Sequence, residues 1–198
     1  MALFFKKAAT AAVLGFAFVA NTVFAGSITN GDFATGDLTG WTSAGPVSVG
    51  DNGTYKYASL FAGLGQNVYT TLSQTVHLDA GDVLSGNAQF LAHDYLPYND
   101  DTFVSINGTN VFVSDVATVG DNGTSALTGF SFTALTGGDY TIVAGVENRM
   151  DNSYPSELQV SSFAVASAVP EPTSVALLGL GLLGFVASRR KSAKSYNA

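Results

Sequence analysis

The chain has 198 residues and no cysteine, and its 15 acidic residues outnumber its eight basic ones, giving a formal net charge of −7 at pH 7. Six of the basic residues lie in the terminal segments 1–25 and 169–198, so the middle segment carries Lys56 and Arg149 against 14 acidic residues, a charge of −12. This negative field excludes nucleic-acid binding and suits neutral sugars, cationic partners or anionic polymers bridged by divalent cations. The alternative explanation is that the charge only keeps the protein soluble.

Residues 1–25 have the composition of a secretory signal peptide. Two lysines precede an uncharged apolar run, and small residues follow it at the positions that a signal peptidase reads. We predict cleavage between Ala25 and Gly26. Residues 26–168 are then carried across the inner membrane and make up the functional domain.

The first part of this domain, residues 28–41, reads ITNGDFATGDLTGW. It resembles the first strand and turn of jelly-roll carbohydrate-binding modules and related galactose-binding-like domains. The resemblance implies that Phe33 and Trp41 belong to the core. Some of these modules hold a structural calcium near this strand, for which Asp32 is a candidate ligand, but Ala34 stands where the family commonly has an acidic residue.

Most of the remaining domain alternates apolar and polar residues with a period of two, which predicts half-buried strands. The predicted strands are residues 72–78, 83–91, 102–106, 110–113, 129–133, 140–147 and 158–165. Clusters of Gly, Asn and Asp separate them, and no long amphipathic helix is predicted. About eight short strands without a disulfide predict an all-β fold, an antiparallel β-sandwich that is most simply a jelly roll of the galactose-binding-like kind.

Two six-residue stretches, 49–54 and 119–124, have the same sequence, VGDNGT, and Asn107 begins a third Asn-Gly-Thr. Asn-Gly supplies the positive φ angles of a tight hairpin turn. We therefore interpret the repeat as reuse of a turn sequence, with an internal duplication as the weaker alternative.

The most polar part of the domain is the loop 93–101, together with the later segment 147–154. Both supply hard oxygen donors, the ligands that calcium prefers. The candidate calcium ligands are Asp94, Asn99, Asp100, Asp101 and Asp151. Their spacing does not match an EF-hand.

The same loops carry Tyr95, Tyr98 and Tyr154. Tyrosine rings stack on sugar rings, and neighbouring amides and carboxylates bind hydroxyl groups, so these tyrosines are the candidate glycan-binding residues. The alternative is a solvated acidic loop whose tyrosines pack on the edge of the sandwich.

Catalytic motifs are absent from the sequence: it has no cysteine nucleophile, Gly-x-Ser-x-Gly, His-Glu-x-x-His or phosphate-binding loop. His77 is predicted to face outward from a strand, and His93 has no serine at motif spacing. A glycosidase needs only two carboxylates, which the acidic composition supplies. We nevertheless predict a protein that is not an enzyme.

The last 30 residues form a second targeting segment. It consists of the motif Val169-Pro170-Glu171-Pro172, an uncharged span at 173–188, and a basic end at 189–198 that begins with Arg189 and Arg190. As a helix, the span reaches about 24 Å, which fits a thin bilayer, and the basic end keeps the C-terminus cytoplasmic. This order of parts resembles the sorting signal of PEP-CTERM proteins and implies recognition by an exosortase. The alternative is a plain tail anchor.

Together these features predict an exported protein of a Gram-negative bacterium, anchored transiently in the inner membrane and delivered to the periplasm, the outer surface or the exopolysaccharide matrix. Its predicted role is to bind glycan or other matrix components, with or without Ca²⁺. The alternatives are a structural coat protein without a small ligand and a polysaccharide-modifying hydrolase.

Overall fold

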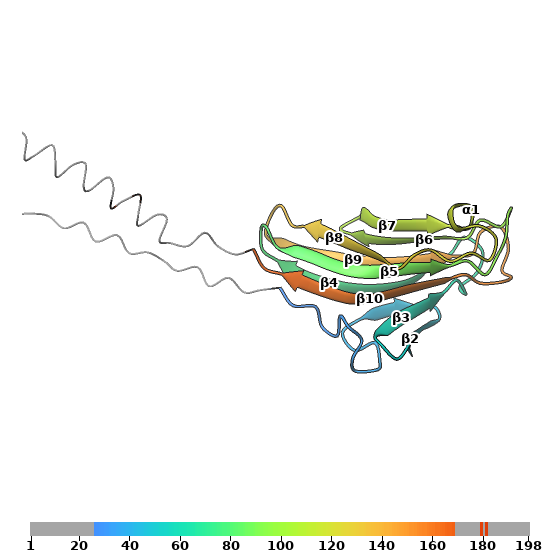
Figure 1. Ribbon diagram of the computed structural model, residues 1–198, viewed down its shortest axis with the longest axis horizontal. Helices are drawn as coiled ribbons and strands as arrows, with labels where there is room; N and C mark the ends of the chain where they lie inside the picture. Colours follow the sequence, from blue (N-terminus) through green and yellow to red (C-terminus); the bar gives the residue numbers. More distant parts are fainter. Residues whose placement is uncertain (1–25, 169–178, 180, 182–198) are drawn as a thin grey trace, which may run out of the picture.

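The computed structural model describes residues 26–168, and Gly179 and Gly181 of the tail, and shows two antiparallel sheets packed face to face (Figure 1). The elements are β1 (Thr42–Ala44), β2 (Val47–Asp51), β3 (Lys56–Phe61), β4 (Thr70–Leu78), β5 (Val83–Leu91), β6 (Asp101–Ile106), β7 (Thr109–Asp115), α1 (Val116–Val119), β8 (Thr128–Thr133), β9 (Gly138–Glu147) and β10 (Glu157–Ala166). Among these residues, no helix has the length and apolar character needed to cross a bilayer. The predicted signal peptide, sorting motif and membrane span lie outside the described residues, apart from the two glycines.

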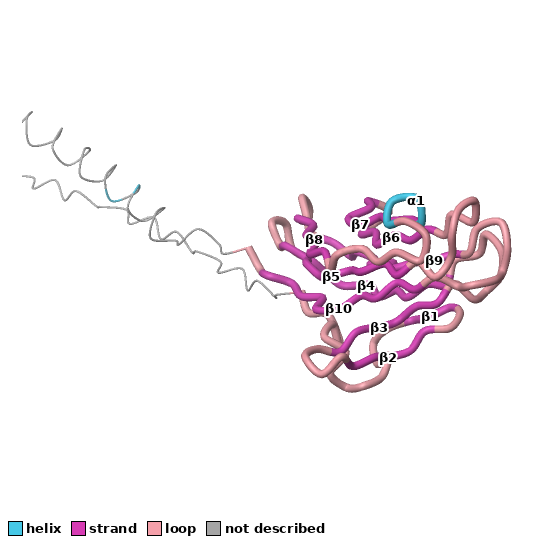
Figure 2. Tube along the Cα trace, turned by 45° about the vertical axis from the view of Figure 1, so that its right-hand side comes forward, coloured by secondary structure: helices cyan, strands magenta, loops and turns pink. Residues whose placement is uncertain are grey.

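Each sheet has five strands. The first has the order β1-β4-β9-β6-β7 and the second the order β2-β3-β10-β5-β8. Figure 2 shows the two layers and the β2–β3 hairpin at one edge. All seven predicted strands are present, so the predicted antiparallel sandwich of the jelly-roll class is confirmed. Strands β1, β2 and β3 were not among the predicted strands.

The core lies between the sheets and follows the predicted alternation. In β9 the side chains of Tyr140, Ile142, Ala144 and Val146 are buried, and the neighbouring strands bury residues at the same spacing. His77 faces outward as predicted, with Nδ1 2.8 Å from Oδ1 of Asp139. Burial of the alternating apolar side chains is the main force that joins the two sheets.

Segment 28–41 is a run of turns, so the strand expected there is absent. Polar side chains bind the backbone N–H groups that a strand would need: Asn30 Oδ1 accepts from Thr35 N, and Asp32 Oδ1 from Ala34 N. Such local bonds compete with strand pairing. The prediction that Phe33 and Trp41 are core residues is confirmed, since their side chains are 0% and 8% exposed.

The Asn-Gly turns differ from one another. Asn107 and Gly108 both have positive φ and close the β6–β7 hairpin. Stretch 49–54 ends β2 and starts a hairpin, whereas stretch 119–124 follows α1. The two identical sequences therefore occupy different structures, which favours local reuse over duplication.

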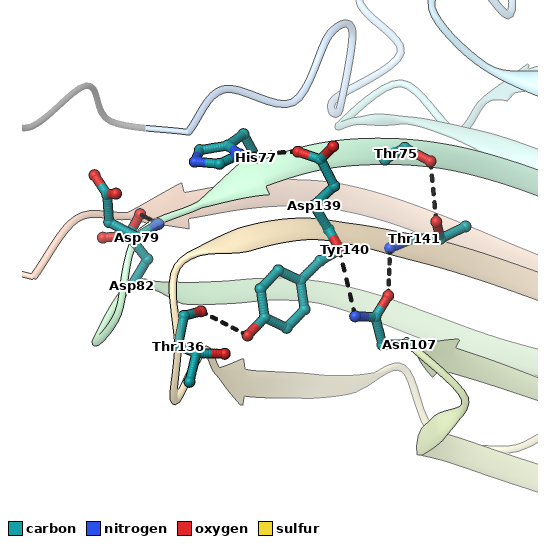
Figure 3. Close-up of polar contacts among 9 residues, drawn as sticks. All are labelled: Thr75, His77, Asp79, Asp82, Asn107, Thr136, Asp139, Tyr140 and Thr141. Carbon is teal, nitrogen blue, oxygen red and sulfur yellow. Dashed lines mark hydrogen bonds and ion pairs between the residues drawn. The ribbon is translucent and has the colours of Figure 1, made fainter.

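Asn107 also joins the β6–β7 turn to β9 by hydrogen bonds, and Figure 3 shows those of its side chain. Its N–H donates to Thr141 O (2.9 Å), and its Oδ1 accepts from Thr141 N (2.8 Å). We expect Asn107→Ala to lower the free energy of unfolding by about 2 kcal/mol, because it removes the side-chain bonds to Thr141 N and Asp139 O and leaves alanine in the left-handed region. Asn107→Gly removes only these side-chain bonds and should cost about 1 kcal/mol. Urea denaturation of the full-length chain measures both, and equal costs would contradict the backbone part of this argument.

The chain enters and leaves the sandwich at one end, beside the β4–β5 turn (Figure 1). Gly26 lies against the His77 carbonyl, and Ala168 N donates to Asp82 Oδ1 (2.9 Å). Helix α1 and the long loops lie at the opposite end.

Candidate functional site

Three loops converge at the end of the sandwich that lies away from the chain termini. They are the β5–β6 loop (92–100), the α1–β8 loop (120–127) and the β9–β10 loop (148–156). Asn122 N donates to Asp94 O (2.9 Å), and His93 Nδ1 lies 2.9 Å from Pro155 O. These contacts bring residues 28 and 62 positions apart in the sequence onto one surface.

The predicted tyrosines come together on this surface, and we refer to Tyr95, Tyr98 and Tyr154 as the tyrosine patch. The ring of Tyr95 is 5.5 Å from that of Tyr98, edge to face, and 6.5 Å from that of Tyr154. Tyr95 is 43% exposed and Tyr154 is 62% exposed, and Leu96 and Met150 on the same loops are also exposed. A solvent-facing aromatic cluster of this kind is suited to stacking on a flat, partly apolar ligand.

The predicted oxygen ligands do not form one group. Asp94 and Asp100 are fully buried, whereas Asp101 points to the outer face of its sheet. Asn99 instead supports α1, because its Oδ1 accepts from Ala117 N (2.7 Å). Asp151 Oδ1 accepts from Ser153 N (2.9 Å) in the turn before Tyr154.

Asp94 and Asp100 belong to a buried polar cluster that also contains Asn148 and Ser156, all at most 2% exposed. Asp100 links the β5–β6 loop to both ends of the β9–β10 loop, since it accepts from Arg149 N (2.9 Å) and from Ser156 Oγ (2.7 Å). The Asp94 Oδ1 accepts from Tyr95 N (2.8 Å). The second oxygen of Asp94 and the Oδ1 of Asn148 are buried and have no hydrogen-bond partner.

Burial raises the pKa of both Asp94 and Asp100. The neighbouring charge of Asp151 raises both pKa values further, and the charge of Asp100 adds to the increase for Asp94. The raised pKa values mean that the two carboxylates lie close to other negative charge. No cation among the described side chains around them compensates this charge.

The outer face holds a second polar group, which was not predicted from the sequence. Arg149 binds Asp101 Oδ2 through Nη2 (2.6 Å) and Glu147 Oε1 through Nε (2.9 Å), and Tyr69 donates to Asp101 Oδ1 (2.6 Å). Tyr69, Asp101 and Phe103 line one side of an open groove of about 490 Å³ over β6 and β7. Asp101 is 32 residues from Tyr69 and 48 residues from Arg149 along the chain. No local pattern in the sequence indicates this pairing.

The residues near Phe33 do not fit the structural calcium that the resemblance to carbohydrate-binding modules implies. The hollow that Asp32 lines, about 410 Å³, also contains Lys56, whose Nζ donates to Ala34 O (3.2 Å). An ammonium group there opposes a second cation. Ala34 also supplies no carboxylate.

No three His, Cys, Asp or Glu side chains of the described residues gather closely enough to hold a metal by themselves. His93 is engaged by the Pro155 carbonyl, and its ring lies 6.1 Å from that of Phe61. The geometry therefore gives His93 a structural contact between the β5–β6 and β9–β10 loops.

Residues 168–191 match the family described as the PEP-CTERM protein-sorting motif. This match implies an exported, membrane-anchored precursor that an exosortase processes. The match is confined to the tail, and no curated protein sequence matches the chain.

Several solved structures are similar to the chain in fold. The TmCBM61 module in complex with β-1,4-galactotriose is 18% identical over 70% of this chain and 96% of its own, with a TM-score of 0.45. The CBM22-1 xylan-binding domain of Paenibacillus barcinonensis Xyn10C is 14% identical over 70% and 93%, with a TM-score of 0.43. A cyclase from Fischerella sp. TAU is 12% identical over 72% and 98%, with a TM-score of 0.44.

Proposed function

We propose that this chain, whose tail carries a PEP-CTERM sorting motif, is a non-catalytic glycan-binding protein of the cell surface or exopolysaccharide matrix. In this proposal, signal peptidase removes residues 1–25 and an exosortase acts at the tail of the precursor. The exported sandwich then binds matrix polysaccharide through the tyrosine patch. The proposed cell is Gram-negative, with a transient stay of the precursor in the inner membrane.

The observation that carries this proposal is the convergence of three tyrosines from two distant loops at an exposed surface. Leaving large rings in water costs free energy unless a ligand or partner covers them. The surrounding loops add carboxylates and backbone amides that bind hydroxyl groups. The high negative charge of the domain disfavours direct contact with anionic polymers, so neutral polysaccharide is the first ligand to test.

We expect the double variant Tyr95→Ala and Tyr154→Ala to bind neutral polysaccharide at least about tenfold more weakly than the wild type, because both stacking surfaces are removed. Affinity electrophoresis or a glycan array with the full-length chain measures the change. The matched control is Tyr55→Ala with Tyr57→Ala, which removes an edge-to-face pair with a 6.2 Å centroid distance from the β2–β3 hairpin. The control should bind as the wild type does.

The same experiment separates the alternatives. Absence of binding to every polysaccharide tested contradicts the proposal and favours a structural coat protein. Equal binding by the two double variants would indicate that the polysaccharide binds another surface, such as the groove beside Tyr69. Release of reducing ends from the polymer by the wild type would instead indicate a hydrolase.

A further inference from the structure

The buried polar cluster lies where the apolar core stops at the tyrosine end of the sandwich. Alternating burial continues beyond the strands, from Ile106, Val104 and Thr102 to Asp100 in the first sheet and from Phe90 through Ala92 to Asp94 in the second. The inner surfaces of both sheets therefore end in carboxylates. A buried carboxylate is costly unless hydrogen bonds or a cation compensate it.

Strand register places Asn148 beside Asp100. Asp101 of β6 pairs with Glu147 of β9, so the next residues outward on these antiparallel strands are Asp100 and Asn148. Since Asp101 and Glu147 both bind Arg149 on the outer face, Asp100 and Asn148 share the inner face. The unpartnered Oδ1 of Asn148 thus belongs to the same inner surface as the carboxylate of Asp100.

The hydrogen-bond donors of the described residues do not satisfy this cluster. Backbone N–H groups and the Ser156 hydroxyl serve Asp94 Oδ1 and both oxygens of Asp100. Asp94 Oδ2 and Asn148 Oδ1 remain buried without a donor. Unpaired buried acceptors are rare in folded proteins and indicate a missing partner.

The two basic side chains of the domain do not supply that partner. Arg149 extends over the outer face to Asp101 and Glu147, and Lys56 binds the Ala34 carbonyl. Asp151, in the loop after Asn148, is close enough for its charge to act on Asp94 and Asp100. Excess oxygen acceptors and excess negative charge therefore occur at the same place.

We propose that the buried polar cluster binds one Ca²⁺, with Asp94 Oδ2, Asn148 Oδ1 and the Asp100 carboxylate as protein ligands. All of these donors are hard oxygen atoms, and calcium accepts six to eight of them in a flexible geometry, so water completes the shell. Asn148 also lines a hollow of about 300 Å³, together with Asn152 and Pro155. Magnesium is disfavoured because it requires near-octahedral geometry and retains its water.

The bound ion would join both loops that carry the tyrosine patch. Asp94 and Asp100 bracket the segment with Tyr95 and Tyr98, and Asn148 begins the loop that leads to Tyr154. Calcium would therefore order the tyrosine patch. This consequence depends on the proposed glycan binding, whereas the calcium site itself does not.

Thermal unfolding of the full-length chain in mild detergent, followed by the fluorescence of Trp41, tests the site. We expect about 1 mM Ca²⁺ to raise Tm by about 5 °C or more over EDTA, and the same concentration of Mg²⁺ to raise it much less. Isothermal titration calorimetry should give one Ca²⁺ per chain. No Ca²⁺-dependent shift and no heat of binding would overturn the proposal, whether or not the chain binds glycan.

Asp94→Asn gives the sharpest result, because it should change Tm in opposite directions under the two conditions. In EDTA the variant should melt higher than the wild type, since an unpaired buried charge has been removed. In Ca²⁺ it should melt lower than the wild type and show no response to the ion. The matched control is Asp139→Asn, an exposed carboxylate at the other end of the sandwich, which should keep the wild-type response. A normal Ca²⁺ response in Asp94→Asn would place the ion elsewhere and refute the assignment.

Discussion

Replacing Phe33 by alanine is expected to lower the free energy of unfolding by about 3–5 kcal/mol, the usual cost of truncating a fully buried aromatic side chain. The Phe33 ring is 5.5 Å from that of Trp41, which is itself 4.9 Å from Phe163 of β10. The three rings pack the segment before β1 against the core. Alanine would leave a cavity there and would keep the left-handed backbone at φ 53°.

Urea denaturation followed by far-UV circular dichroism measures this effect without relying on Trp41, whose environment the substitution changes. The control is Leu135→Ala, because Leu135 is 86% exposed and its truncation should change stability by no more than about 0.5 kcal/mol. Similar losses in the free energy of unfolding for the two variants would show that the packing of segment 28–41 on the core does not contribute to stability.

Replacing Arg149 by methionine is expected to cost about 2 kcal/mol at neutral pH. The guanidinium itself is half exposed, but it neutralises Glu147, whose side chain is 5% exposed, and Asp101. Methionine keeps most of the packing and leaves two carboxylates facing each other without a cation. Lys56→Met is the matched control, because Lys56 makes one exposed bond to a carbonyl, and it should cost less than about 1 kcal/mol.

The cost of Arg149→Met should depend on pH. Burial, with the nearby charge of Asp101, raises the pKa of Glu147. Stability from such a group is fully present below its unfolded pKa and is lost as pH rises through its folded pKa. The variant should therefore approach wild-type stability in mild acid, where Glu147 is protonated. Denaturation curves at pH values between about 4 and 8 check this, and a cost that is constant across that range would contradict it.

Periodicity was sufficient to predict most of the sandwich. The runs that became β4, β5 and β9 are nine or ten residues long, enough for a period of two to be clear, and β10 alternates on either side of a register shift between Ser161 and Ala164. In contrast, β1 has three residues, all exposed, and carries no such signal. The turns at 28–41 were mistaken in part for a strand because their backbone is held by side-chain bonds that an apolar pattern does not show.

The candidate site was predictable only where its residues are close in sequence. Tyr95 and Tyr98 stand in one loop, and aromatic residues beside acidic ones indicated a binding surface. Asn148 gave no signal, because its importance depends on cross-strand register with Asp100. Asp101 and Asn99 were predicted as calcium ligands together with Asp94 and Asp100, but in the structure they bind Arg149 and Ala117 N, since alternation turns neighbouring side chains to opposite faces.

The placement of the chain ends has a mechanical consequence. The exit at Ala168 and the tyrosine patch lie at opposite ends of the sandwich, and β10 runs between them with β3 on one side and β5 on the other. If the tail is anchored and a polymer pulls on the tyrosine patch, tension runs along β10. Its ladders on both sides would then be loaded in shear, so that many hydrogen bonds resist together instead of opening one by one.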